Sequence, residues 1–112
     1  MEKYSIQTMM QGDVAVVTVT GRIDSETSPM LDAELTKVAA HSAKLVIDLA
    51  GVGYMSSAGI RALVKASQAA QRSGGAVKLA LVPESVMAIL YTVGLTQVVG
   101  AYATVGEAAE SF

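Results

Sequence analysis

The sequence predicts an α/β fold built on a mixed, mostly parallel sheet of four to five strands, with an N-terminal β-hairpin and about four helices. Two β-rich runs separated by only three residues open the chain, which favours an antiparallel hairpin. Short apolar runs then alternate with amphipathic runs of helical length, which favours right-handed crossovers between parallel strands. The 112 residues fit one domain, residues 1–112, since typical domains contain about 100 to 150 residues.

The predicted hairpin occupies the first twenty residues. Residues 4–10 alternate loosely between apolar and polar side chains, as a half-buried strand does. Residues 11–13 form a turn, and residues 14–20 are β-branched apart from Ala15, which predicts the second strand. The Gly-Arg-Ile-Asp segment 21–24 is expected to end this strand, with Ile23 filling a position in the core.

An amphipathic helix is predicted next, up to His41 and Ser42. Pro29 suits its first turn, and its apolar stripe lies at residues 31, 35, 38 and 39. Asp24, Ser25 and the two hydroxyl residues at 27 and 28 all qualify as N-caps, so the sequence leaves the cap open.

Residues 44–64 are the most informative stretch of the chain. Residues 45–49 are apolar except for Asp48, which is typical of a central strand covered on both faces. Gly51 and Gly53 are expected to form a tight reversal, and a helix is predicted from Ser57 to about Arg72. A strand end, a loop and a helix N-terminus together make a site in α/β proteins.

The C-terminal third contains three further predicted elements. After the helix stop at residues 73–75, the apolar run 76–82 predicts a strand and residues 83 to about 94 a short helix. Residues 95–99 are predicted as a brief fifth strand or a loop, and residues 101–103 as an extended segment. Thr104 and Glu107 form a capping-box pattern for a final helix to about Ser111.

Composition excludes several classes of function. Without cysteine there are no disulfides and no thiolate metal sites. Eight scattered basic residues and a net charge of −2 argue against nucleic-acid binding. The N-terminus does not resemble a signal peptide, and no apolar run approaches the roughly 20 residues of a membrane span. We therefore expect a cytoplasmic protein without a metal or cofactor. Composition does not decide the oligomeric state, and a monomer is the default expectation.

Ser56 and Ser57 are separated by the phase of the predicted helix. Ile60, four residues after Ser56, centres the apolar face together with Leu63, and Val64, Ser67 and Gln71 continue it. Ser56 should therefore point inward and cap the helix. Ser57 precedes Arg61 by four residues and should point outward, where another protein can reach it. The alternative is that the pair serves only as an N-cap.

Four other kinds of side chain have predicted roles. Asp48 is expected to accept hydrogen bonds from backbone N–H groups near the strand end, and His41 to lie on the surface or cap a helix. Of the methionines, those at 9, 10 and 87 are predicted to be core residues, whereas Met55 beside the serines suits an interface. A nucleophilic serine is not indicated, because no Gly-x-Ser-x-Gly elbow is present.

The order of elements, the Gly-Arg-Ile-Asp segment 21–24 and the motif Ile-Asp-Leu-x-x-Val-x-Tyr-Met-Ser-Ser-Ala-Gly-Ile-Arg at 47–61 resemble the STAS domain family (sulfate transporter and anti-sigma factor antagonist). The resemblance covers nearly the whole chain. It is greatest to the small, free-standing bacterial anti-sigma factor antagonists, and it implies a STAS-like fold.

This resemblance implies a phosphorylation switch that controls transcription. The unphosphorylated antagonist binds an anti-sigma factor that is also a serine kinase, phosphorylation releases it, and a serine phosphatase resets it. Ser57 falls on the acceptor position, with Ser56 as second choice. Ser56 stands where the family usually has Asp, and Ala58 where it usually has a second hydroxyl.

The resemblance also implies which side chains contact the partner. The loop after the second strand takes part in partner contact in the family, so Asp24 and Ser25 are candidates, although Asp24 serves equally well as a helix cap. With Met55, Ser56, Ser57 and Arg61 they form the expected partner-binding set. In this role the protein is not an enzyme.

Two other functions compete with this one. The first is a constitutive STAS subunit of a transporter or lipid-trafficking ATPase complex, in which the serines only cap. The second is a ligand-binding or nucleotide-hydrolysing domain, which the lack of a Gly-x-x-x-x-Gly-Lys-Ser/Thr run disfavours.

Overall fold

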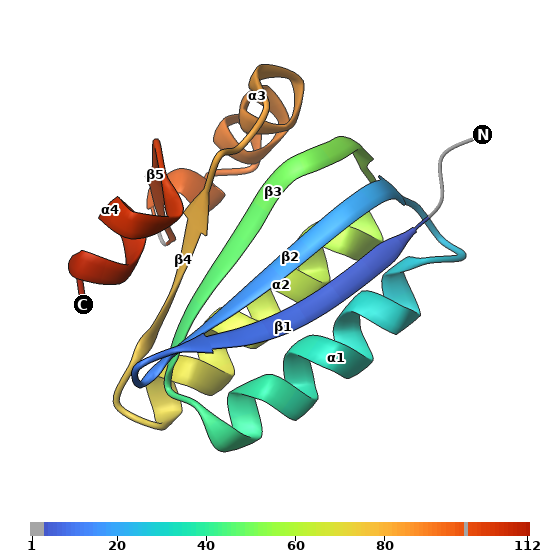
Figure 1. The fold of residues 1–112 in the computed structure, drawn as a ribbon. Helices are drawn as coiled ribbons and strands as arrows, with labels where there is room; N and C mark the ends of the chain where they lie inside the picture. Colours follow the sequence, from blue (N-terminus) through green and yellow to red (C-terminus); the bar gives the residue numbers. More distant parts are fainter. Residues whose placement is uncertain (1–3, 98) are drawn as a thin grey trace.

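The computed structural model describes residues 4–97 and 99–112, and within these residues five strands form one sheet flanked by four α-helices and a 3₁₀ helix (Figure 1). The strands lie side by side in sequence order, the first pair antiparallel and the other pairs parallel. This confirms the predicted α/β class, the mixed sheet and the N-terminal hairpin. The elements are β1 (Ser5–Gln11), β2 (Val14–Ile23), α1 (Ser28–His41), β3 (Lys44–Met55), α2 (Ser57–Arg72), β4 (Ala76–Ala80), α3 (Glu84–Thr92), η1 (Leu95–Gln97), β5 (Gly100–Tyr102) and α4 (Val105–Glu110).

The sheet buries side chains on both faces. Alternate residues of β2 and β3, from Ala15 and Leu45 onward, join one core cluster with the buried sides of α1 and α2. On the opposite face, Val16 and Val46 form a smaller cluster with Ala108 of α4. The middle of β3 is therefore covered on both faces, as predicted from its apolar run.

The strands β2 and β3 are longer than the sequence indicated. The predicted reversal at Gly51 and Gly53 is wrong, because β3 continues through both glycines and stays paired with β2 up to Ile23 and Met55. The pairing shifts register twice, and each shift inserts one extra residue into β3. A Cβ on Gly51 would lie 2.6 Å from Cγ2 of Thr20, so glycine permits the close approach of the two strands.

The extension of β2 and β3 decides where the site lies. Both strands reach the same end of the sheet, where the parallel strands have their C-terminal ends, and the start of α2 follows β3 after one residue. Figure 1 shows α1 and α2 side by side on one face of the sheet, and both helices begin near this end of the sheet.

Two other strand predictions need correction. The strand β4 ends at Ala80, before the predicted limit, and Leu81 has a positive φ of 55°. Leu95–Gln97 is a 3₁₀ helix with Leu95 buried, so the strand alternative for this segment is wrong. The fifth strand is Gly100–Tyr102, which overlaps the segment 101–103 that was predicted to be extended. Val98, which belongs to the predicted segment 95–99, lies outside the described residues. The final helix begins as predicted, with the Thr104 hydroxyl accepting a hydrogen bond from the Glu107 N–H at 3.0 Å.

Two methionines predicted to be core residues are on the surface. Met9 is 67% exposed and Met10 55%, because β1 is an edge strand and α1 covers little of it. Met87 is half-buried on α3. Over the part of the chain that the structure describes, no helix has both the length and the apolar character needed to cross a bilayer.

Candidate functional site

The candidate site lies where β2 and β3 end and α2 begins. The two strand ends are tied to each other by a hydrogen bond from the Ser56 N–H to the Ile23 carbonyl oxygen at 2.8 Å. Ser56 has an extended backbone, with φ −81° and ψ 170°, and the helix starts at the next residue. Strand pairing therefore fixes the position of both serines.

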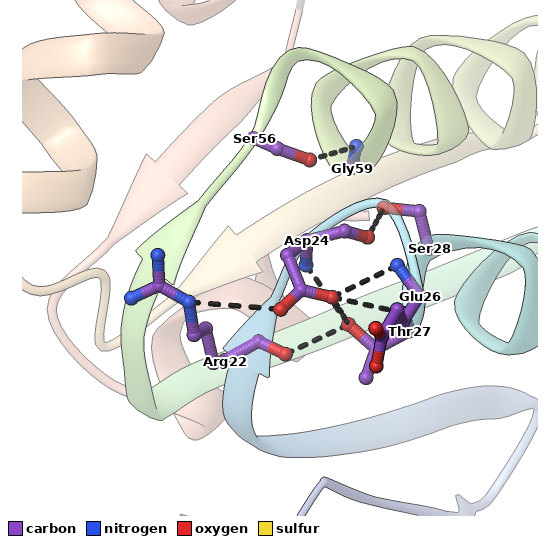
Figure 2. Close-up of polar contacts among 7 residues, drawn as sticks. All are labelled: Arg22, Asp24, Glu26, Thr27, Ser28, Ser56 and Gly59. Atoms are coloured by element: carbon purple, nitrogen blue, oxygen red, sulfur yellow. Dashed lines mark hydrogen bonds and ion pairs between the residues drawn. The ribbon is translucent and has the colours of Figure 1, made fainter.

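Ser56 caps α2. Its hydroxyl oxygen accepts a hydrogen bond from the backbone N–H of Gly59 at 3.4 Å, which satisfies one of the free donors of the first turn (Figure 2). The side chain is half-buried. This arrangement confirms the predicted inward direction of Ser56 and its capping role.

Ser57 is exposed on the first residue of α2, and its hydroxyl makes no hydrogen bond among the described residues. Residues 61, 65, 68 and 72 on the same side of the helix are also exposed, as the helical phase predicted. The predicted buried face needs one correction, because Gln71 is exposed and the buried stripe runs through Ala66 and Ala70 instead. The two hydroxyls are therefore in different environments.

The Asp24 loop is held together by its own hydrogen bonds. One carboxylate oxygen of Asp24 accepts from the backbone N–H groups of Glu26 at 2.9 Å and Thr27 at 3.2 Å (Figure 2). The Thr27 hydroxyl donates to the carbonyl oxygen of Arg22 at 2.7 Å. The Glu26 and Thr27 N–H groups lower the pKa of Asp24, so the carboxylate is ionised at neutral pH.

The cap of α1, which the sequence left open, is Thr27. Its side chain makes no capping bond to the helix, and Pro29 lies in the first turn as predicted. Asp24 instead organises the loop that leads into the helix.

A surface groove separates the first turns of α1 and α2. Its volume is about 400 Å³. An ion pair between Lys65 and Asp32, at 3.3 Å, connects its two walls. The groove brings two of the predicted contact residues together, Ser25 from the loop and Arg61 from α2. Its lining comprises Ser25, Ser28, Pro29, Asp32, Ala58, Arg61, Ala62 and Lys65.

Met55 is a core residue, which corrects its predicted place in an interface. Its side chain is only 2% exposed. It packs beneath Gly59, where an added Cβ would lie 2.9 Å from Cγ of Met55 and 2.6 Å from Cγ2 of Ile23. The methionine therefore holds the start of α2 close to the sheet, and its side chain is not available to a partner.

Asp48 has the structural role that the sequence indicated. One of its oxygens accepts a hydrogen bond from the Ala50 N–H at 2.9 Å, beside the first register shift. Among the residues that the structure describes, no three acidic or histidine side chains are arranged to hold a metal ion.

Arg22 and Tyr54 are surface residues of this site that the sequence did not single out. They pair across β2 and β3, and the Arg22 guanidinium carbon lies 4.0 Å from the centre of the Tyr54 ring. Both lie in the segments 21–24 and 47–61 that carry the family resemblance, but neither was predicted to contact a partner. Their proximity follows only from the continuation of both strands past their glycines.

The fold and the site define an α/β domain that presents an exposed serine where a central strand leads into a helix. Residues 5–108 match the family model of the STAS domain, and the chain belongs to that family.

Solved structures with the same fold carry different functions. An anti-sigma factor antagonist from Mycobacterium paratuberculosis is 24% identical, with a TM-score of 0.89 over 97% of this chain and 93% of that one. The phosphorylated form of the Bacillus cell fate determinant SpoIIAA is 15% identical, with a TM-score of 0.75 over 96% and 98% of the two chains. A sulfate transporter family protein from Wolinella succinogenes is 14% identical, with a TM-score of 0.77 over 92% and 87%. At these identities the likeness establishes the fold alone.

Proposed function

We propose that this protein is an anti-sigma factor antagonist of a partner-switching pathway. In its unphosphorylated form it binds an anti-sigma factor that is also a serine kinase, and phosphorylation of Ser57 releases it. A serine phosphatase restores the binding form. The protein acts in the cytoplasm as a monomeric binding module and not as an enzyme.

One observation carries the proposal: Ser57 presents an exposed hydroxyl at the start of α2 while Ser56 serves as the cap. A kinase can reach the Ser57 oxygen without displacing a hydrogen bond of the fold. Phosphorylated SpoIIAA shares this fold, which supports the proposal that this chain is regulated by phosphorylation.

The start of α2 suits a phosphoserine in electrostatic terms. Free backbone N–H groups and the helix dipole attract an anion at this end. Arg61 lies one turn further on, is exposed, and forms no ion pair among the described residues. A phosphate on Ser57 would gain a charged partner there, so modification should leave α2 folded.

Phosphorylation therefore acts by changing the surface of the protein at the start of α2. A phosphate adds a charge of about −1.5 to −2 and considerable bulk beside the groove between α1 and α2. Both disfavour a protein docked there. The antagonist loses its partner because its surface changes while its fold stays intact.

A constitutive subunit of a transporter or lipid-trafficking complex is the second candidate, because the sulfate transporter family neighbour has the same fold. In that role Ser56 and Ser57 would only begin the helix. The two functions differ in whether the Ser57 hydroxyl is needed.

The test uses the serine kinases of the histidine-kinase-like ATPase type from the organism that encodes this chain. Each purified kinase is mixed with the protein, and binding is measured by isothermal titration calorimetry with ADP present. Each mixture is then given ATP, and mass spectrometry maps the modified residue. We expect one kinase to form a micromolar or tighter complex, to modify Ser57, and to release the phosphorylated protein.

Two matched variants make this test specific. Ser57→Ala should keep binding and lose modification, whereas Ser56→Ala should keep both. Modification confined to Ser56, or a phosphorylated form with unchanged affinity, would contradict the switch. A lack of any kinase complex, together with recovery of a permease or transport ATPase in pull-downs, would favour the second candidate.

A further inference from the structure

Arg22 and Tyr54 form a pre-arranged pair on the surface at the end of the sheet. The Arg22 guanidinium carbon lies 4.0 Å from the centre of the Tyr54 ring, within the range of cation–π contact. Both residues remain accessible, since the Arg22 side chain is 56% exposed and Tyr54 38%. Strand pairing of β2 with β3 fixes the two backbones relative to each other.

The guanidinium of Arg22 forms an ion pair but no hydrogen bond among the described residues. Its Nε lies 3.6 Å from Oδ2 of Asp24, and Figure 2 shows the rest of the guanidinium extending away from the Asp24 loop. Within the described residues its two terminal nitrogens have no acceptor. Asp24 uses its other oxygen for the N–H groups of Glu26 and Thr27. The side chain is thus held in one direction while its terminal donors remain available.

Such an arginine suits a carboxylate. The planar guanidinium matches the two oxygens of a carboxylate, and a side chain already held in place loses little freedom on binding. The carboxylates of Asp24 and Glu26 lie in the same loop, so a singly charged ligand meets less repulsion than a phosphate dianion. Arg and Tyr are also the residue types that contribute most to binding at protein interfaces.

The pair lies close to the proposed phosphorylation site. Tyr54 precedes Ser57 by three residues, which limits the separation of their Cα atoms to about 11 Å. An interface of ordinary size, about 800 Å² on each side, is large enough to include both Ser57 and this pair.

We propose that Arg22, held against Tyr54, binds an Asp or Glu side chain of the kinase that recognises Ser57. This inference rests on the proposed function and identifies the charge of the partner at this position. The Arg22 pair contributes to affinity and orientation, whereas Ser57 carries the switch.

The test measures the affinity of unphosphorylated variants for the kinase that modifies Ser57, by isothermal titration calorimetry. Arg22→Gln removes the charge and keeps much of the stem, and we expect about ten- to a hundredfold weaker binding, as for loss of a charged hydrogen-bonded pair. Arg22→Lys should recover only part of this loss, because lysine lacks the planar fork. Arg72→Gln is the matched control, since Arg72 is also exposed but lies in the last turn of α2. It should change the affinity by less than about threefold, as expected for a screened distant charge.

A second measurement separates a contact from a local distortion. Replacing the kinase carboxylate by its amide should weaken binding to the wild-type protein and have little further effect on Arg22→Gln. Amide NMR shifts of residues 24–28 in Arg22→Gln report whether the loop keeps its structure, and Tyr54→Phe should retain the stacking and the affinity.

The outcomes distinguish this inference from the function on which it rests. If the kinase binds and modifies Ser57 but Arg22→Gln binds as well as Arg72→Gln, the carboxylate contact is wrong and the antagonist function stands. The contact is equally wrong if no amide substitution of a kinase carboxylate is coupled to Arg22→Gln, so that the two losses in binding free energy always add. It is also wrong if the affinity loss in Arg22→Gln accompanies a disordered loop. If no kinase binds the wild-type protein, both proposals fail.

Discussion

Replacing Ser56 by alanine tests the capping role that separates the two serines. The variant removes one hydrogen bond, from the Gly59 N–H to the Ser56 hydroxyl oxygen. It leaves the backbone bonds of Ser56 with Ile23 and Ile60 in place. Loss of an N-cap side chain costs about 0.5 to 2 kcal/mol. The bond is long, at 3.4 Å, and the site half-buried, so the lower half of that range, about 0.5 to 1 kcal/mol, is expected.

The expected loss is measurable by heat and by urea. Unfolding entropy scales with length at about 2.1 cal/mol/K per residue, or about 0.24 kcal/mol/K for 112 residues. A loss of 0.5 to 1 kcal/mol therefore lowers the melting temperature by about 2 to 4 °C. Urea unfolding followed by circular dichroism at pH 7 should show a lower midpoint with an unchanged slope.

Ser57→Ala is the matched control for this experiment. It removes an exposed hydroxyl that makes no hydrogen bond among the described residues, so the free energy of unfolding should change by no more than about 0.5 kcal/mol. The reasoning is refuted if Ser57→Ala destabilises the protein more than Ser56→Ala does. It is also refuted if Ser56→Ala unfolds at the wild-type midpoint.

Two further predictions concern Gly59 and Asp24, which lie near the start of α2 and in the loop after β2, and Gly106 in α4 serves as a control for the first. Gly59→Ala should lower the free energy of unfolding by up to about 2 kcal/mol, because its Cβ would crowd Ile23 and Met55 and overpacking outweighs the gain in helix propensity. Gly106→Ala in α4, where an added Cβ meets only an oxygen at 3.9 Å, should be neutral or stabilising in the same urea assay. The lowered pKa of Asp24 stabilises the fold above its unfolded-state pKa of about 3.9, and this contribution is lost as the pH falls through the lower folded-state pKa. Asp24→Asn should therefore show a weaker dependence of the urea midpoint on pH below about 4 than the wild type, and an equal dependence would contradict this.

The architecture was largely predictable from local patterns, whereas the length of the central strands was not. Apolar runs and helix stops placed most elements within a few residues. Gly51 and Gly53 indicated a reversal because glycine is most common where the chain turns. In the folded protein, Gly51 instead allows β3 to approach Thr20 at a register shift. That contact joins residues far apart in the sequence, so a single sequence gives no local sign of it.

The same limit applies to the residues of the site. Ser56 and Ser57 follow from helix phase, which is a local property, and the structure places them as the phase predicted. Arg22 and Tyr54 come together only through the extended pairing of β2 with β3. Met55 was misassigned because its sequence position beside an exposed serine gives no information on its direction; strand alternation turns it inward beside Ile23.

Under the proposed function, the serine at position 56 bears on the stability of the phosphorylated protein, because the antagonists that this chain resembles usually have aspartate there. A carboxylate at the cap would favour the helix N-terminus by about 0.3 to 1 kcal/mol, but it would also repel a phosphate on the next residue. A neutral cap avoids that repulsion and leaves the phosphate to the free N–H groups and Arg61. Ser56→Asp should therefore raise the melting temperature of the unphosphorylated protein and raise that of the Ser57-phosphorylated protein less, or lower it. Calorimetry of the wild type and Ser56→Asp, each with and without the phosphate on Ser57, measures this coupling. An equal shift in melting temperature in the two phosphorylation states would show that residue 56 does not interact with the phosphate.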